Sequence, residues 1–253
     1  MKNCFKGFYL SLGMFTAIPL PAHLWGGACM GLALTCLPLV GGLIGALWWG
    51  AAELLVFSPL HIVLAAAVLT AVPFFVTGFL HLDGYMDTSD AMLSARATEE
   101  KIRILKDPHT GAFAVIMLVV LFLLQFAALY VIMERAANLA LLIIIAVVSR
   151  CCATASILCL DVMRESSYAN IFKQNTGMRH KLFVSAVAVL AVASAYLYAG
   201  TVGIVTALSV IIGYMCATAY VYKEFKGVSG DLTGFAIVIG ELCGLLALAA
   251  IMS

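Results

Sequence analysis

Residues 111–133 read GAFAVIMLVVLFLLQFAALYVIM, a run without a single charged side chain. About 20 such residues in a helix are needed to cross the ~30 Å hydrocarbon core of a bilayer. Other predominantly apolar runs of comparable length lie near 31–56, 60–80, 137–161, 182–199, 202–222 and 232–252. The sequence therefore predicts an all-α fold, a polytopic transmembrane helical bundle of about seven spans.

The composition supports the same conclusion. Of 253 residues, 64% are hydrophobic and only 11% are charged, too few polar groups to cover a soluble globule. The net charge is +1 and the basic residues form no aromatic-interleaved patch, so nucleic acid is not an expected partner. No repeat or low-complexity linker divides the chain, and we expect one integral membrane domain over 1–253.

Two segments at the N-terminal end depart from a simple span. Residues 5–21, FKGFYLSLGMFTAIPLP, are too short and too interrupted to cross a membrane, and they predict an interfacial or re-entrant helix. A signal peptide is not expected, because no small-residue cleavage site closes this stretch. The 31–56 run holds five glycines and Pro38, so it is the span that we expect to be bent.

The cysteines indicate a reducing compartment. Seven of the eight lie in apolar segments without a CxxC pair, and we interpret them as small hydrophobic residues. They are Cys29, Cys36, Cys151, Cys152, Cys159, Cys216 and Cys243.

The loops predict the orientation. If all seven runs cross, only Arg135 falls on one side, and twelve basic residues fall on the other. By the positive-inside bias the basic side is cytoplasmic, with the N-terminus inside and the C-terminus outside. The active site is then expected on the cytoplasmic face, in the inner loops near 81–110, 162–181 and 223–234.

The most informative polar segment is 81–90, HLDGYMDTSD. If it is helical, spacings of four and three place Asp83, Asp87 and Asp90 on one face. No Lys or Arg lies between Val63 and Ser94, and clustered carboxylates repel one another without a cation. Hard oxygen ligands suit Mg²⁺, with Mn²⁺ as an alternative. A merely hydrated helix end is the competing interpretation.

The next segment, 99–111, EEKIRILKDPHTG, has two halves. In the first, Lys101 and Arg103 are expected to contact lipid headgroups. In the second, a turn delivers Lys106, Asp107 and His109 to the mouth of the following helix.

Two further loops suit a phosphorylated ligand. Residues 164–177, RESSYANIFKQNTG, supply cationic and amide side chains, although this signal is weak alone. In 226–234, KGVSGDLTG, three glycines surround Asp231 at a helix start, where free N–H groups favour anions. A purely structural turn explains the glycines equally well.

Arg150 and Glu241 lie deep within apolar runs. Such residues are expected to face a polar cavity or each other, and a structural buried ion pair is an equal alternative. His23, His61 and His180 have no ligand-like spacing and are assigned no role.

Together the inner loops carry acids for a divalent ion, cations for phosphates and a glycine-rich turn. That set is typical of phosphoryl transfer, which depends on positioning and charge neutralisation. No Walker sequence or dinucleotide fingerprint occurs.

Five motifs in order carry a resemblance to a known family. They are FTAIPLP at 15–21, PLVGGLIG at 38–45, HLDGYMDTSD at 81–90, KDPHTGAF at 106–113 and GVSGDLTG at 227–234. From near residue 8 to near 245, the chain resembles the cobalamin synthase family, the adenosylcobinamide-GDP ribazoletransferases. The resemblance implies a multi-pass, Mg²⁺-dependent enzyme of the bacterial inner membrane.

The family reaction implies the substrates. A ribose hydroxyl of α-ribazole, or of its 5′-phosphate, attacks the cobinamide-linked phosphorus of adenosylcobinamide-GDP, and GMP departs. The product is adenosylcobalamin or its 5′-phosphate, which completes the nucleotide loop. A cavity between helices open to the inner leaflet is the expected place for the corrinoid. Membrane lipid is an expected neighbour, and homo-oligomers or association with other cobalamin-assembly enzymes stay open.

The charges and the family reaction together suggest residue roles. Metal ligands are expected among Asp83, Asp87, Asp90 and Asp231, and catalytic roles are expected for Asp83, Asp87, Asp107 and His109. Asp107 or His109 would accept the hydroxyl proton, unless one acid of the cluster is the base. Contacts to substrate or phosphate are expected from His81, Lys106, Arg150, Ser229 and Gly230.

Two positions depart from the family pattern. Ala17 stands where the family tends to carry Arg, and Asn170 where it often has Arg after Tyr-Ala. The Asp83-x-x-x-Asp87 spacing is also similar to half of the metal site of CDP-alcohol phosphotransferases, but the other half of that signature is absent. An ion-coupled secondary transporter is the alternative outside enzymes; against it, the chain shows no internal repeat.

Overall fold

The computed structural model describes residues 2–19, 29–136, 138–163 and 166–252. Every regular element in this part of the chain is a helix, which confirms the all-α prediction. The helices are α1 (Lys2–Phe15), α2 (Met30–Thr35), α3 (Leu37–Val56), α4 (Ile62–Val76), α5 (Leu80–Leu93), α6 (Thr98–Ile104), α7 (Ala112–Arg135), α8 (Leu141–Cys159), α9 (Ser167–Gln174), α10 (Met178–Phe225) and α11 (Gly230–Met252).

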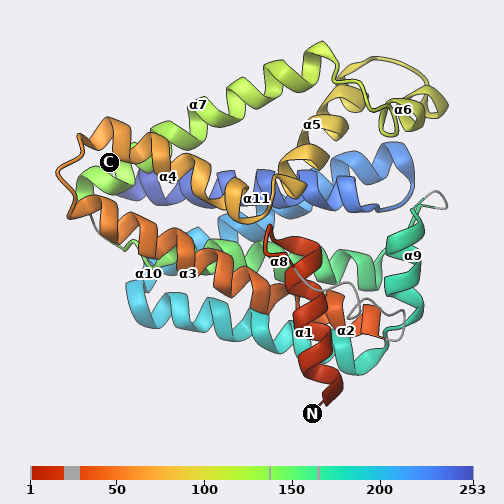
Figure 1. Cartoon of the computed structure of the whole chain (residues 1–253), viewed down its shortest axis with the longest axis horizontal. Coiled ribbons are helices and arrows are strands. Elements are labelled where there is room, and N and C mark those ends of the chain that lie inside the picture. Colours follow the sequence, from red (N-terminus) through yellow and green to blue (C-terminus); the bar gives the residue numbers. More distant parts are fainter. Residues whose placement is uncertain (1, 20–28, 137, 164–165, 253) are drawn as a thin grey trace.

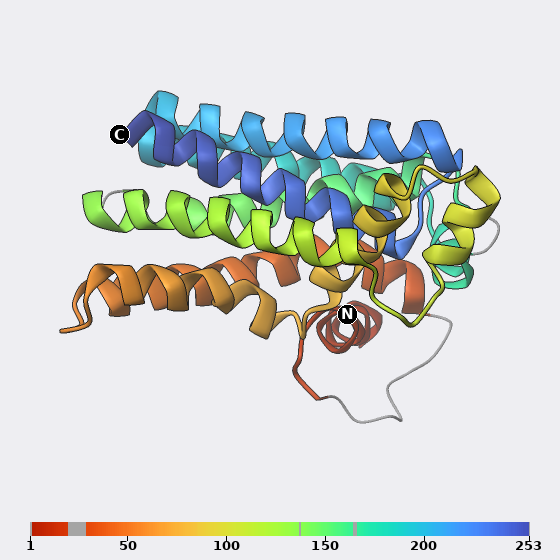
Figure 2. The ribbon, with the colours of Figure 1, turned by 90° about the horizontal axis from the view of Figure 1, so that it is seen from above.

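The long helices lie side by side as a bundle, and α1 crosses it steeply (Figures 1 and 2). In the described part of the chain, five helices are long and apolar enough to cross a membrane, with α10 counted once, and the pair α4 and α5 would make a sixth if it is one broken span. The predicted count of seven is therefore not confirmed. Helix α1, with 14 residues, is not one of these candidate spans, and its interfacial or re-entrant placement stays a prediction.

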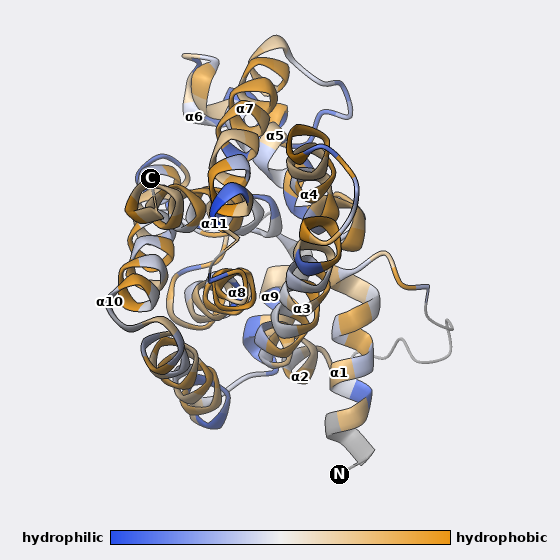
Figure 3. Cartoon of the chain, turned by 90° about the vertical axis from the view of Figure 1, so that its left-hand side faces the viewer, coloured by the Kyte–Doolittle hydropathy of each residue, from blue (hydrophilic) through white to orange (hydrophobic). Residues whose placement is uncertain are grey.

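The outside of the bundle is apolar, as a protein in lipid requires. In Figure 3 hydrophobic colour predominates along α4, α7 and α10. Leu123 on α7 and Leu197 on α10 are 62% and 83% exposed, whereas α8 is buried along most of its length. Helices that are hydrophobic all round belong in a core or a membrane. These features indicate a multi-pass membrane protein.

The 60–80 run ends earlier than predicted. Helix α4 stops at Val76, and Gly78 and Phe79 both have positive φ, 60° and 62°. Two successive left-handed residues cannot continue a right-handed helix, so the chain bends by 94° before α5 begins at Leu80. The bend turns the acidic segment away from the axis of α4.

Two other runs are also interrupted. The 31–56 run is divided at Cys36 into α2 and α3, close to Pro38, as its composition predicted. The 182–199 and 202–222 runs form the two arms of α10, which is broken at Ala199 and Gly200. Gly203 packs directly against the backbone of Ala195, so the second arm folds back along the first.

The polar connections gather at one end of the bundle. Helices α6 and α9 lie at the end opposite the C-terminus and the α3–α4 turn (Figures 1 and 2). Lys101 on α6 pairs with Glu224 at 3.1 Å, and Val162 forms an isolated parallel bridge with Val228. The loops predicted to share one side therefore do so; which side of the membrane this is stays a prediction.

Candidate active site

The site is built where α5 crosses the start of α11. A Cβ on Gly84 would lie 2.8 Å from the carbonyl oxygen of Asp231, and a Cβ on Gly234 would lie 3.5 Å from the Cα of His81. Only glycine at residue 84 allows the two backbones to approach so closely. The crossing brings the acidic helix and the glycine-rich turn together, although some 140 residues separate them in the sequence.

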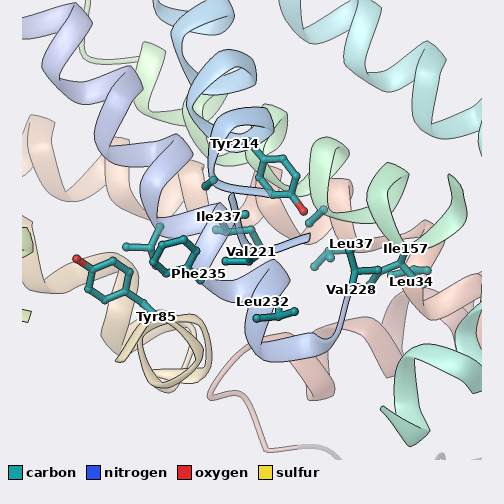
Figure 4. Packing of buried hydrophobic residues seen from close by; sticks show 14 of the residues in the cluster. Leu34, Leu37, Tyr85, Ile157, Tyr214, Val221, Val228, Leu232, Phe235 and Ile237 are labelled. Carbon is teal, nitrogen blue, oxygen red and sulfur yellow. The ribbon is translucent and has the colours of Figure 1, made fainter. Parts of the chain in front are cut away.

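Aromatic packing holds this crossing in place. The rings of Tyr85 and Phe235 are stacked, with centroids 5.6 Å apart and planes 12° from parallel, as Figure 4 shows. The Tyr85 hydroxyl donates a hydrogen bond of 3.1 Å to the Met117 carbonyl on α7. One face of α5 is thus fixed to α11 and α7, which leaves the acids on its other face.

The acidic residues form one electrostatic cluster. The segment is helical, as the spacing of Asp83, Asp87 and Asp90 required. Repulsion reaches the carboxyl of Asp87 from all three acidic neighbours, Asp231 included. Among the described residues none of these four carboxylates forms an ion pair. Four neighbouring acids without a basic partner favour a cation.

The carboxylates could supply only some of the ligands of a divalent ion. Within the described part of the chain, no three His, Cys, Asp or Glu side chains converge on one point. Mg²⁺ is commonly held by one or two carboxylates, with water and substrate phosphate oxygens completing its shell. The acidic cluster fits that mode of binding, and it does not fit a closed, all-protein cage.

The loop before α7 reaches the same cluster through Gly111. This residue packs against the Asp90 carboxylate so closely that a Cβ there would overlap it. Lys106, Asp107 and His109 are exposed. The His109 ring nitrogen Nδ1 lies 2.7 Å from Asp107 Oδ1, and the backbone N–H of His109 donates to the same oxygen at 3.0 Å. That backbone bond, aided by the ring, holds the pKa of Asp107 below its usual range.

A cavity of about 340 Å³ is lined in part by Asp231. His81 lies on its wall, is 6% exposed, and its Nε2 has no hydrogen-bond partner. Gly230 also lines this cavity. The Ser229 hydroxyl instead accepts a bond of 3.3 Å from the Leu232 N–H and so caps α11. Its predicted contact with phosphate stays a prediction.

Arg150 and Glu241 face each other, one of the two predicted outcomes. They form an ion pair between α8 and α11 with exposures of 1% and 8%, and Ser149 Oγ donates to Glu241 at 3.0 Å. Because each charge is the partner of the other, a structural ion pair is enough to explain why both are buried. Arg150 also acts electrostatically on His81, and its role in phosphate binding stays a prediction.

The structure corrects the expectation for Lys101 and shows what Asn170 contacts. Lys101 is not free for lipid headgroups, because it is 8% exposed and paired with Glu224, which also accepts from Thr98 at 2.7 Å. Asn170 donates to the Met163 and Ser166 carbonyls, so its amide holds the loop before α9. Pro21, His23 and Arg164 lie outside the described residues.

Sequence reasoning missed Gly84 and the aromatic wall of the cavity. A glycine inside a helix costs about 1 kcal/mol relative to alanine, and its place between Asp83 and Asp87 was a signal of close backbone packing. Phe15 and Phe172, whose rings lie 6.4 Å apart, come from helices with no shared pattern in the sequence.

The fold and the site define a polytopic α-helical membrane protein with an acidic cluster at the loop-rich end of its bundle, and no basic residue of the described ranges forms an ion pair with that cluster. The model of the cobalamin-5-phosphate synthase family matches residues 7–249, and the chain belongs to this family. No solved structure matches the chain.

Two relatives illustrate the similarity. An adenosylcobinamide-GDP ribazoletransferase of Clostridium botulinum (strain Alaska E43 / Type E3) is 37% identical over 245 residues, covering 97% of each chain. One from Clostridium perfringens (strain ATCC 13124) is 36% identical over 251 residues, covering 99% of this chain and all of the relative.

Proposed function

We propose that this protein transfers the adenosylcobinamide-phosphate group of adenosylcobinamide-GDP to α-ribazole or its 5′-phosphate, with release of GMP. The observation that carries the proposal is the meeting of Asp231 with the acidic face of α5 at the Gly84 crossing. Family membership supports the choice of substrates. The acidic cluster, which has no ion pair within the described residues, offers a place for a metal-bound diphosphate.

The reaction is a displacement at phosphorus. A ribose hydroxyl oxygen forms a bond to the cobinamide-linked phosphorus, the bond from that phosphorus to the GMP oxygen breaks, and the hydroxyl proton passes to a carboxylate. Asp87 and Asp231 are the proposed acceptors, because they belong to the two helices that meet at the Gly84 crossing. Asp107 is a weaker base than an ordinary carboxylate, since its hydrogen bonds stabilise the charged form.

Mg²⁺ would be held by Asp83, Asp87, Asp90 and Asp231, in pairs completed by the diphosphate. When bound, it neutralises charge that develops on the departing GMP. Mn²⁺ has the same preference for oxygen ligands and would replace it. Lys106, on the exposed loop before α7, would contact the outer phosphate or the membrane surface.

The proposed location is the bacterial cytoplasmic membrane, with the acidic end of the bundle facing the cytoplasm. The basic residues of α6, α9 and the α10–α11 connection lie at that end, as the positive-inside bias requires. A water-soluble, GDP-bearing substrate then has direct access to the acids.

Purified protein in detergent or vesicles tests the function. With adenosylcobinamide-GDP, α-ribazole and Mg²⁺, the protein should form a corrinoid product and an equal amount of GMP. Omission of α-ribazole should abolish GMP release, and chelation of the metal should abolish both products. Ion-driven uptake of substrate without chemistry would contradict the proposal and favour a transporter.

A further inference from the structure

The cavity beside Asp231 is lined by residues of seven helices. It is bounded by α1, α2 with the start of α3, α5, α8, α9 and α11, and most of its lining is apolar. Its volume of about 340 Å³ is at the small end of the range for small-molecule sites, roughly 300–1,000 Å³. A nucleoside fits such a volume, whereas a corrinoid macrocycle, which is several times larger, does not.

The residues that line the cavity are of two kinds. His81, Gly230 and Asp231 contribute polar groups from α5 and the start of α11. Phe15 and Phe172 contribute neighbouring aromatic rings from α1 and α9. A ligand that matches both kinds has a polar, hydroxyl-bearing part joined to a flat aromatic part.

The unpartnered nitrogen of His81 is a second indication of a ligand. A buried polar atom without a hydrogen bond costs about 1–3 kcal/mol, so most such atoms find a partner. The Nε2 of His81 has none in the described structure, and the ring is 6% exposed. A neutral imidazole offers one donor and one acceptor, which suits a sugar hydroxyl or a ring nitrogen.

We propose that this cavity binds the nucleoside acceptor, with its ribose at His81 and Asp231 and its benzimidazole base against Phe15 and Phe172. This proposal rests on the proposed function, and it assigns the acceptor, one of the two substrates of that reaction, to this cavity. The corrinoid diphosphate then stays outside the cavity, on the acidic face of α5. Asp231 lies between the two, where a ribose hydroxyl meets the phosphorus.

Small side chains set the room available for the base. Ala169 on α9 and Ala153 on α8 line the cavity and are 2% and 1% exposed. Replacing Ala169 by Leu adds three carbon atoms beside Phe172. Because the base is proposed to pack against Phe172, the substitution should penalise a bulky base more than a smaller one.

The test compares two acceptors in Ala169→Leu. The acceptors are α-ribazole and its analogue without the two ring methyl groups, supplied with adenosylcobinamide-GDP and Mg²⁺. We expect kcat/KM for α-ribazole to fall about tenfold relative to the analogue, which is the usual discrimination for one or two methyl groups in an apolar pocket. The KM for adenosylcobinamide-GDP should stay unchanged. Ala127→Leu, on the exposed side of α7, is the matched control and should leave both acceptors unaffected.

A second variant and a binding measurement guard against a folding defect. Ala153→Val makes a smaller change on another wall and should shift selectivity in the same direction. Calorimetric binding of α-ribazole to the detergent-purified protein, without the corrinoid substrate, should weaken in both cavity variants. Equal loss for the two acceptors, or unchanged binding of α-ribazole, would overturn the assignment, as would a lipid retained in the cavity of the active protein. Wild-type protein that forms no GMP with α-ribazole would contradict the proposed function instead.

Discussion

Gly84 lies against the backbone of Asp231, so closely that a Cβ on Gly84 would be 2.8 Å from the Asp231 carbonyl oxygen. This one contact joins the acidic helix α5 to the start of α11. It sets the position of Asp231 relative to Asp83 and Asp87, and therefore the geometry of the site.

Gly84→Ala should lower both the stability and the activity of the protein. The added methyl group meets backbone, which cannot rotate away, so α5 must move; overpacking of this kind costs about 1–3 kcal/mol. A displacement near 1 Å in a catalytic site can reduce the rate about 100-fold. GMP release in membranes measures the loss. Gly50→Ala is the control, because nothing lies within 4 Å of a Cβ there; equal activity of the two variants would show that the crossing is not critical.

Gly111→Ala should displace the carboxylate of Asp90 without disturbing the backbone. The Gly111 φ of −82° suits alanine, and the three atoms nearest to the new Cβ all belong to the Asp90 carboxyl group. If Asp90 contributes to metal binding, the variant should require more Mg²⁺ for half-maximal activity. An unchanged Mg²⁺ dependence would remove Asp90 from the site.

Arg150→Met should destabilise the protein by about 3–5 kcal/mol, because it leaves Glu241 buried without a partner. The double variant Arg150→Met, Glu241→Gln should recover much of this loss. Thermal unfolding in detergent measures both. Activity in the double variant decides the role of Arg150: near-normal turnover means that the pair is structural, and an inactive but stable protein supports phosphate binding.

The pH profile should distinguish Asp107 from the acids of α5. Hydrogen bonds from His109 keep the pKa of Asp107 below the usual value of about 3.9, so this carboxylate stays charged from about pH 5 upward. An acidic limb of kcat above pH 5 therefore reports another group. Asp107→Asn should leave that limb in place, and its disappearance would identify Asp107 as the base.

The sequence predicted which residues belong to the site better than it predicted how the fold brings them together. Spacing alone placed Asp83, Asp87 and Asp90 on one helix face, and the glycine-rich turn drew attention to Asp231. The bend before α5 was not predicted, because the apolar run continues through Gly78 to Leu80 and hydropathy carries no information on φ. The cavity was missed for a similar reason: Phe15 and Phe172 meet only through tertiary packing.

Lys101 shows the limit of reasoning from loops. A basic residue in an inner loop normally contacts headgroups, but its partner Glu224 lies at the end of α10, more than 100 residues away. No local pattern predicts this ion pair.

The central claim is that the acids of α5 and α11 form one site for a metal-bound diphosphate. GMP release from adenosylcobinamide-GDP in the presence of α-ribazole and Mg²⁺ tests it most directly, in Asp87→Asn and Asp231→Asn, with Glu99→Gln as the control because Glu99 is exposed on α6. We predict that both site variants lose at least about 100-fold in rate, as expected when electrostatic stabilisation of the transition state is removed, while the control keeps full activity. Release of GMP at the wild-type rate by either site variant would contradict the account.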